Sequence, residues 1–571
     1  MIDVKIELEM NKILKIIYLS ILFPVAFVHA QDNKGNERGE VTDAEFIIRK
    51  DRVLTLPNRP RNFERVPSIP QAEGKSNFTY DVRDFFFNLQ PSKSSIQAHQ
   101  KRFPSTTADL YHTMVKLGYG NYMSPLAEIH VNNLESDYLN YGVFLKHQGF
   151  YEGPVDKENS AEDHTNVRLN ASYFTEFFEV FGELGYNRDR HHFYGYTPGT
   201  DVEAEDIQQI FNTIYGQGGI RNIDKEGPIN YEAKLGLRLF NDDYSAREHE
   251  VNFSGLSFYN FNEETKAGVD IKAFLTSPSD VTYRDINRNY VKFTPYVAYQ
   301  NEVFEVRAGV NLVAENDDYE GKESDFHIFP TINASYNLQE EFAIYALYEG
   351  DVQRNTYYSF AMENPFLGPS DQLLNTIQKF RAEGGIKGSV NDALTYKLGV
   401  AYGDFDNLHF YVNSLADSAR FSILYNNGTA LNYTGSLGYS FSDLFHLNAE
   451  ANYYHYSLDY EDDLNADDAV PSPWHRPEWV IKLHNTFTPD QKLMIQAGLD
   501  LMGGIYAKNE LSGNTDTLSP IIDLNTKIDY KITDRFSVFA QGNNLLNQKN
   551  ERFWNYQSRG IQGIGGLTFK F

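Results

Sequence analysis

From about residue 108 to Phe571, the chain repeats one pattern, in which apolar and polar side chains alternate in runs of about ten residues. The pattern is nearly unbroken in residues 231–239, 304–312 and 493–501. In the first of these runs, Tyr231, Ala233, Leu235, Leu237 and Leu239 alternate with Glu232, Lys234, Gly236 and Arg238. Because successive side chains of a strand point to opposite faces, each run predicts a strand with one apolar face. Membrane-spanning β-barrels and soluble β-sandwiches both show this alternation.

The spacing of tight turns distinguishes these two fold classes. Short turn sequences occur at residues 337–340, 390–392, 442–443, 489–490 and 533–534. They recur roughly every 45 to 55 residues, which leaves room for two membrane-length strands and a loop between them. Longer polar connections occupy residues 153–163, 351–378 and 461–476. Short turns at one edge and long loops at the other predict an all-β protein, a transmembrane antiparallel β-barrel of about 22 strands.

Aromatic residues support a membrane location, since Phe, Tyr and Trp make up 15% of the chain. Tyr336 and Phe342 flank one tight turn, and Phe441 and Phe445 flank another. Flanking aromatics of this kind are typical of the girdle at the edge of the lipid-facing band. We therefore expect the apolar faces to contact lipid and the polar faces to line the lumen.

This assignment of faces predicts which side of the barrel wall single residues face. Leu235, Val310 and Leu499 are expected to face lipid, where an arginine would be costly. Gly236 and Asn311 are expected to face the lumen, where an arginine would be tolerated better.

Residues 1–30 have the pattern of a secretory signal peptide. Lys12 and Lys15 precede an apolar run at residues 16–28, and Val28-His29-Ala30 is a small-residue cleavage site. The apolar run is shorter than the roughly 20 residues that a membrane-spanning helix needs. We expect the mature chain to begin at Gln31, followed by an N-terminal segment of residues 31–107 and a barrel of residues 108–571.

Two segments of the predicted barrel carry the pattern of a known family. Residues 535–556 combine a short strand, an Asn-Leu-Leu-Asn turn and a group of aromatic residues, and the last strand ends at Phe571. That ending resembles the closing hairpin of TonB-dependent receptors, and residues 115–133 resemble a first barrel strand of that family. The resemblance implies an integral outer-membrane protein of a Gram-negative cell, surrounded by outer-membrane lipid, that transports a solute. A passive porin and a structural subunit of an outer-membrane complex are the alternatives.

The N-terminal segment departs from that family, whose barrel is closed by a plug and energised by an inner-membrane complex. Residues 31–107 are too few for such a plug, and we find no energy-coupling box near Gln31. Residues 45–57 form the only apolar, strand-like stretch within the segment. We therefore expect a shortened or missing plug, and the missing box argues against an energy-coupling complex. A periplasmic or surface partner subunit is another candidate partner.

A basic strip within the N-terminal segment is the candidate for occluding the lumen. Its basic residues are Arg49, Lys50, Arg52, Arg59, Arg61 and Arg65. Against Asp51 and Glu64 they give a local net charge of +4, in a chain whose net charge is −27. Arginine forks pair well with carboxylates, so the strip could lie extended in an acidic lumen. The other interpretation is a disordered periplasmic tail.

Other kinds of chemistry find little support in the sequence. The chain has no cysteine, and its net charge of −27 argues against nucleic acid as a partner. His191 and His192 are adjacent, so on a strand they would point to opposite faces and could not share a metal ion. The acidic run from Asp459 lacks the glycine-punctuated spacing of a calcium loop. Since no catalytic or phosphate-binding motif occurs, we expect neither an enzyme nor a cofactor nor a metal site.

Overall fold

The computed structural model describes residues 111–571, except for residues 134–135, 137, 198, 225–226, 282–285, 317–323, 340, 370–372, 392, 415–416, 443, 460–471 and 510–513. The expected signal peptide and the basic strip between Arg49 and Arg65 lie outside the described residues. The division of the chain at residues 30 and 107 therefore stays a prediction. Within the described part, no helix is both long enough and apolar enough to cross a membrane.

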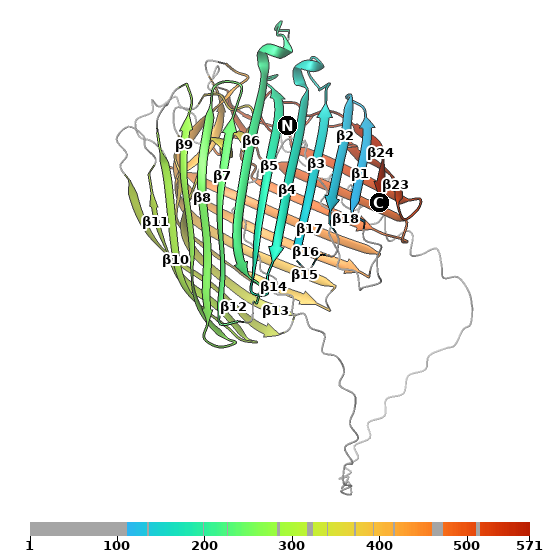
Figure 1. The fold of residues 1–571 in the computed structure, drawn as a ribbon. Helices are drawn as coiled ribbons and strands as arrows, with labels where there is room; N and C mark the ends of the chain where they lie inside the picture. Colours follow the sequence, from blue (N-terminus) through green and yellow to red (C-terminus); the bar gives the residue numbers. More distant parts are fainter. Residues whose placement is uncertain are drawn as a thin grey trace, which may run out of the picture. The chain divides into compact units, whose positions relative to one another are not determined.

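The wall of the barrel is a 22-stranded sheet in which every neighbouring pair is antiparallel. The first half comprises β1 (Thr113–Gly120), β2 (Ser124–Asn132), β3 (Leu139–Phe150), β4 (Glu162–Phe174), β5 (Phe178–His192), β6 (Gln208–Asn222), β7 (Ile229–Asn241), β8 (Arg247–Asn260), β9 (Thr265–Ser279), β10 (Arg288–Gln300) and β11 (Phe304–Glu315). The second half comprises β12 (Asp325–Gln339), β13 (Phe342–Gln353), β14 (Thr376–Val390), β15 (Leu394–Asn413), β16 (Phe421–Phe441), β17 (Phe445–Leu458), β18 (Trp479–Phe487), β19 (Leu493–Gly503), β22 (Ile521–Lys531), β23 (Phe536–Asn543) and β24 (Gln562–Lys570). The last strand, β24, pairs with β1, so the sheet closes on itself (Figure 1). The predicted fold class and strand number are confirmed.

Short elements outside the wall lie in the connections. They are η1 (Glu158–Ser160), η2 (Ala204–Ile207), α3 (Tyr357–Glu363) and the hairpin of β20 (Tyr506–Asn509) and β21 (Asn514–Thr517).

The segment that resembles a single first strand is in fact a hairpin. Residues 115–133 contain most of β1 and all of β2, which are joined by a turn at residues 121–123. Tyr122 and Met123 have φ angles of 59° and 47°, in the left-handed region, which reverses the chain. The side chain of Asn121 fixes this turn against the last strand, since its Nδ2 donates to the Ile561 carbonyl at 2.6 Å and its Oδ1 accepts from the Gly563 N–H at 2.8 Å.

The two faces of the strands are divided as predicted. Leu235 and Leu237 are 60% and 46% exposed on the outer face of β7. On the inner face of β11, Asn311 is buried, and it bonds to the Thr294 hydroxyl and the Gly350 carbonyl, both at 2.8 Å.

Two positions differ from what the alternation implies. Leu499 is only 3% exposed, because it lies between Leu483 and Leu524 in the ladder. At Gly236, an added Cβ would lie 2.6 Å from Oδ1 of Asn252, so a side chain there would displace its neighbour. Leu235 is therefore the most informative lipid-facing position, and neither Gly236 nor the bonded Asn311 is a suitable lumen control.

An aromatic girdle lies at one edge of the barrel. Phe177, Phe261 and Phe441 are 70%, 63% and 55% exposed in or beside the short turns. Phe304 and Tyr336 pack together at the same edge, with ring centroids 4.7 Å apart. This arrangement confirms the predicted flanking aromatics and matches the interfacial girdles of transmembrane barrels.

The connections are divided between the two edges. The five predicted tight turns join β12 to β13, β14 to β15, β16 to β17, β18 to β19 and β22 to β23. All five lie at the edge where Thr113 and Phe571 exchange backbone hydrogen bonds of 2.9 Å, which we call the short-turn edge. The opposite, long-connection edge carries the connections that join β13 to β14, β17 to β18, β19 to β22 and β23 to β24.

Epitope tags should show which edge faces the outside of the cell. Tags after Asn159, Asp463 or Gly513 belong to connections of the long-connection edge and should be accessible to antibody on intact cells. Tags at Asn391 or Asp534, in turns of the short-turn edge, should be accessible only after permeabilisation. The Asn159 amide bonds to Tyr196 and Val202, so the tag there carries the greater risk of disturbing the fold. The opposite labelling pattern would invert the topology.

Candidate functional site

The connection between β13 and β14, residues 354–375, contains the helix α3 and is called the α3 connection here. A capping box starts the helix, because Thr356 Oγ1 accepts from the Ser359 N–H at 3.0 Å while Ser359 Oγ accepts from the Thr356 N–H at 2.8 Å. The helix lies against β8, although its connection begins and ends several strands away in the wall. The α3 connection therefore crosses the lumen.

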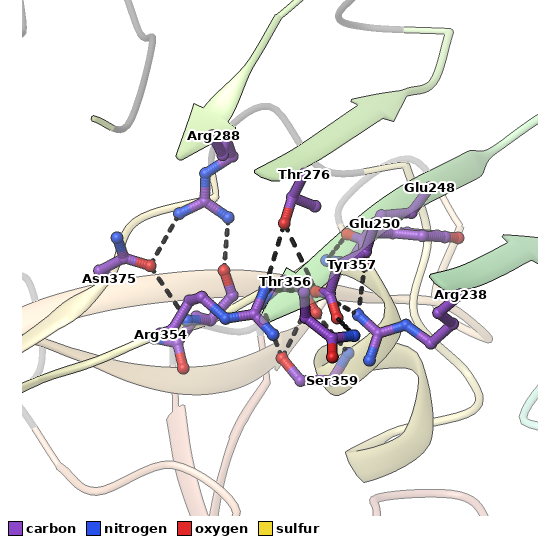
Figure 2. Close-up of polar contacts among 12 residues, drawn as sticks. Arg238, Glu248, Glu250, Thr276, Arg288, Arg354, Thr356, Tyr357, Ser359 and Asn375 are labelled. Carbon is purple, nitrogen blue, oxygen red and sulfur yellow. Dashed lines mark hydrogen bonds and ion pairs between the residues drawn. The ribbon is translucent and has the colours of Figure 1, made fainter. Parts of the chain in front are cut away.

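A buried group of charges holds the start of the α3 connection to the wall (Figure 2). Arg354 pairs with Glu250 of β8 at 2.7 Å, and Glu250 also pairs with Arg238 of β7 at 2.8 Å. Glu248 lies 3.1 Å from Arg238 and accepts the Tyr357 N–H at 2.8 Å. Glu248 and Glu250 are 0% and 2% exposed. A buried carboxylate destabilises the fold unless it is paired and hydrogen-bonded. Arg238 and Arg354 supply the positive charges that Glu248 and Glu250 need.

A second polar group joins both ends of the α3 connection to the wall (Figure 2). Arg288 of β10 donates to the Asn355 carbonyl and to Oδ1 of Asn375, the latter at 3.0 Å. The same Asn375 oxygen accepts the Asn355 N–H at 3.0 Å, and Asn375 Nδ2 donates to Glu315 of β11 at 2.6 Å. Asn375 thus links the start of the connection, its end and two wall strands.

An aromatic core packs the α3 connection against other connections. Phe366 stacks on Tyr556 of the β23–β24 connection, with ring centroids 3.5 Å apart. It also meets Tyr194 of the β5–β6 connection at 5.8 Å and Phe553 at 6.2 Å. The same core buries Phe193, Phe211, Phe240, Tyr357, Phe360, Tyr411 and Phe421. Because these residues come from strands and connections distributed around the wall, the connections meet one another across the lumen at the long-connection edge.

The end of α3 carries a buried carboxylate. Glu363 lies 2.9 Å from Nε2 of His409 on β15. Burial raises the pKa of Glu363, but His409 together with the Arg476 and Arg552 guanidinium groups brings the pKa below its ordinary value. Glu363 is therefore negatively charged at neutral pH, and it offsets the guanidinium charges of Arg476 and Arg552, which belong to two different connections.

His475 joins the β17–β18 and β23–β24 connections. Its Nδ1 donates to the Tyr411 carbonyl at 2.7 Å, and its Nε2 accepts the Trp554 N–H at 3.3 Å. Burial lowers the pKa of His475 to about 3, which keeps the ring neutral. The neutral ring with its proton on Nδ1 satisfies both contacts, so this histidine acts as a fixed link between connections.

The candidate sites considered from the sequence do not form a site among the described residues. His191 and His192 point to opposite faces of β5, as expected for neighbours on a strand. His191 Nδ1 lies 4.0 Å from Glu162, whereas His192 Nδ1 donates to the Ala161 carbonyl at 2.7 Å. Residues 460–471 of the acidic run that starts at Asp459, and the basic strip from Arg49 to Arg65, lie outside the described residues.

The α3 connection is a functional candidate that the sequence alone did not reveal. Residues 351–378 are predicted only as a polar connection. The available signal was the run Tyr-Tyr-Ser-Phe-Ala-Met at residues 357–362, which is unusually apolar for a solvated loop. A loop of that composition must pack against another part of the protein.

Comparisons with known proteins concern the fold. No family model and no curated protein matches the sequence. Among solved structures, the ferric-catecholate import receptor Fiu from E. coli K12 is similar with a TM-score of 0.60 and 12% identity, covering 81% of this chain and 82% of Fiu. The siderophore receptor PiuA from Acinetobacter baumannii gives 0.61 and 10%, covering 82% of each chain. The iron transporter FrpB from Neisseria meningitidis gives 0.62 and 11%, covering 80% of this chain and 81% of FrpB.

These similarities confirm the resemblance of the barrel to TonB-dependent receptors at the level of fold. The structure itself adds the exposed apolar faces and the aromatic girdle, which are the features of a barrel that lipid surrounds. The chain is therefore an integral outer-membrane protein with a 22-stranded barrel.

Proposed function

We propose that this protein transports a solute across the outer membrane through its barrel, and that the α3 connection is the gate at the outer end. The observation that carries the proposal is the way the α3 connection crosses the lumen and is fixed there by the charges of Arg354, Glu250 and Glu248. Charged contacts can be exchanged for contacts with a polar solute, which apolar packing cannot offer. Among the structural relatives, Fiu is an import receptor and FrpB is an iron transporter, which also supports transport.

The same comparison suggests which cargo to test first. Fiu is a ferric-catecholate import receptor, and PiuA is a siderophore receptor. Ferric chelates are therefore the first solutes to test for binding to the purified barrel. Transport should require movement of the α3 connection, because the aromatic core around Phe366 closes the path of a ferric chelate through the lumen.

A passive porin and a structural subunit are the two alternative functions, and each predicts a different behaviour of the purified protein. A passive porin should conduct ions when purified alone, yet the α3 connection and the aromatic core cross its lumen. A structural subunit should neither bind a solute nor conduct, and it should co-purify with a partner subunit. The crossing connections favour a gated transporter over the open porin.

The N-terminal segment is the candidate for closing the inner end of the lumen. We propose that residues 31–107 occlude the lumen there, with Arg49, Lys50, Arg52, Arg59, Arg61 and Arg65 paired to lumen carboxylates. Support comes from the local charge of +4 in a chain of net charge −27. The segment would take the place of a larger plug. Because it has no recognisable energy-coupling box, this proposal does not require an energy-coupling complex.

Single-channel conductance tests both occluding parts. We expect the mature chain to conduct weakly, and the variant lacking residues 31–105 to conduct more. Replacement of Arg49, Arg52, Arg59 and Arg61 by Gln should raise conductance in the same direction, and high salt should do so in the unmodified chain, because screening weakens such pairs. If the deletion and the four-Gln variant both conduct like the unmodified chain, residues 31–105 are a tail and the connections alone occlude the lumen.

A further inference from the structure

Three side chains with metal-binding groups converge at the long-connection edge of β11 and β12. Asp325 and His327 are two residues apart on β12, so they share one face of the strand. Glu315 is the direct partner of Asp325 in the β11–β12 ladder. One ligand atom from each of the three residues lies within 4.8 Å of the other two. This is the one such group of three or more among the residues that the structure describes.

The distance between His327 and Glu315 suits two ligands of one ion. Their Nε2 and Oε1 atoms are 3.5 Å apart, beyond the 2.7–3.2 Å range of an N–H···O hydrogen bond. Two donors bound to one Zn²⁺ at about 2.0–2.1 Å, with a tetrahedral angle between them, lie about 3.4 Å apart. Nε2 of His327 is buried and has no hydrogen-bond partner among the described residues. The imidazole nitrogen therefore points at the carboxylate without bonding to it.

Most other histidine–carboxylate pairs of the barrel behave differently. His130 lies 2.7 Å from Glu128, His409 lies 2.9 Å from Glu363, and His484 lies 3.1 Å from Asp500. These three pairs are at hydrogen-bonding distance, and among the described residues none of them has a third ligand close enough to form a group. Two further pairs, His164–Glu162 at 3.8 Å and His191–Glu162 at 4.0 Å, are also wider than a hydrogen bond. The His327 group is therefore marked by the buried Nε2 without a hydrogen bond together with the nearby Asp325, and not by the separation alone.

The surroundings of the group orient its members. Glu315, whose side chain is fully buried, accepts a hydrogen bond of 2.6 Å from Nδ2 of Asn375. The His327 ring stacks on Phe329, with centroids 5.6 Å apart and an interplanar angle of 9°. Ligands held by a hydrogen bond or by packing in this way are typical of metal sites, in which the second layer of contacts fixes the first.

We propose that Glu315, Asp325 and His327 bind a divalent first-row transition-metal ion such as Zn²⁺. One imidazole nitrogen and two carboxylates suit such an ion, whereas Ca²⁺ and Mg²⁺ prefer oxygen ligands alone. Three protein ligands leave at least one coordination position for water or for a group of another molecule.

The site also contacts the proposed gate. Asn375, at the end of the α3 connection, donates to Glu315 and accepts from Arg288. A metal ion on Glu315 fixes the carboxylate to which Asn375 bonds. Occupancy of the site should therefore stabilise the closed position of the α3 connection.

Metal binding can be measured on the full mature chain in detergent, purified without a histidine tag. After equilibrium dialysis against ZnCl₂, we expect elemental analysis to find about one equivalent of Zn²⁺. The His327→Gln and Asp325→Asn variants should each bind Zn²⁺ at least about tenfold more weakly, and Asn375→Ala should weaken binding about 10–100-fold. Co²⁺ should give ligand-field absorption bands that His327→Gln abolishes, and excess Ca²⁺ should not displace Zn²⁺.

The matched control is His484→Gln, which removes a histidine from a pair without a third ligand. It should bind Zn²⁺ like the unmodified chain, and circular dichroism should show that every variant retains its strands. Absence of zinc binding by the unmodified chain would overturn the proposal. So would zinc binding that is equal in the unmodified chain, His327→Gln and Asp325→Asn, because the ion would then bind elsewhere.

Discussion

Replacing Glu250 with alanine should release the α3 connection from the wall. The substitution leaves Arg354 without its carboxylate and leaves Arg238 with only Glu248, in a region where both carboxylates are buried. Removing one partner of a buried ion pair typically costs about 3–5 kcal/mol, because an uncompensated charge remains in a poorly hydrated place. We expect part of that cost to appear as detachment of the connection, which lets water reach Arg354.

Three measurements follow detachment of the α3 connection. Chymotrypsin should cleave after Tyr357 or Phe360, which are buried in the closed structure. Conductance should rise, and the free energy of unfolding in detergent should fall. The double variant Glu250→Ala with Arg354→Ala should cost less than the sum of the two single variants, because the second substitution removes the charge that the first leaves unpaired.

The control for this prediction is Glu232→Ala on β7. Glu232 pairs with Lys234 in the lumen and is about one quarter exposed, so its loss should cost no more than about 1 kcal/mol. It does not touch the α3 connection. If Glu250→Ala resists chymotrypsin and conducts like Glu232→Ala, the charges do not hold the gate.

Replacing Leu235 with arginine should strongly impair assembly of the barrel in the membrane. Leu235 is the middle residue of β7, is 60% exposed, and lies on the apolar outer face. An arginine that faces hydrocarbon near the bilayer midplane costs about 2–4 kcal/mol, because its charge loses water without gaining a partner. The folded fraction in membranes and the urea midpoint of the assembled barrel measure this cost.

Gln217→Arg is the matched lumen control at nearly the same depth. Gln217 pairs with Gly236, the neighbour of Leu235, and is exposed on the inner face of β6. It also lies beside Glu183 of β5 in the ladder, which gives the new arginine an acidic neighbour. Gln217→Arg should therefore assemble almost normally, and Leu235→Ala should show how much of the loss is packing rather than charge. Equal assembly of Leu235→Arg and Gln217→Arg would contradict the assignment of faces.

The strands of the barrel wall can be predicted from the sequence, because the patterns that specify them are local. Alternation over one strand assigns Leu235 to lipid, and a turn sequence such as that at residues 390–392 joins two strands that are neighbours in the chain. The last strand shows the same correspondence, since Leu567 and Phe569 are exposed while Gln562 and Thr568 are buried. The first hairpin was missed because its turn depends on Asn121 contacts with Ile561 and Gly563, at the other end of the chain.

The fold class, the approximate number of strands, the lipid-facing sides and the edge of the short turns can all be predicted from sequence patterns. The crossing of the lumen by the α3 connection, and the meeting of Glu315 with Asp325 and His327 on one face, are visible only in the folded barrel. The difference lies in the distance along the chain between interacting groups. Tyr357 and Glu248 are 109 residues apart, and Tyr194 and Gln557 are 363 residues apart. No period or local motif records such contacts, because they arise when the closed wall brings its connections together.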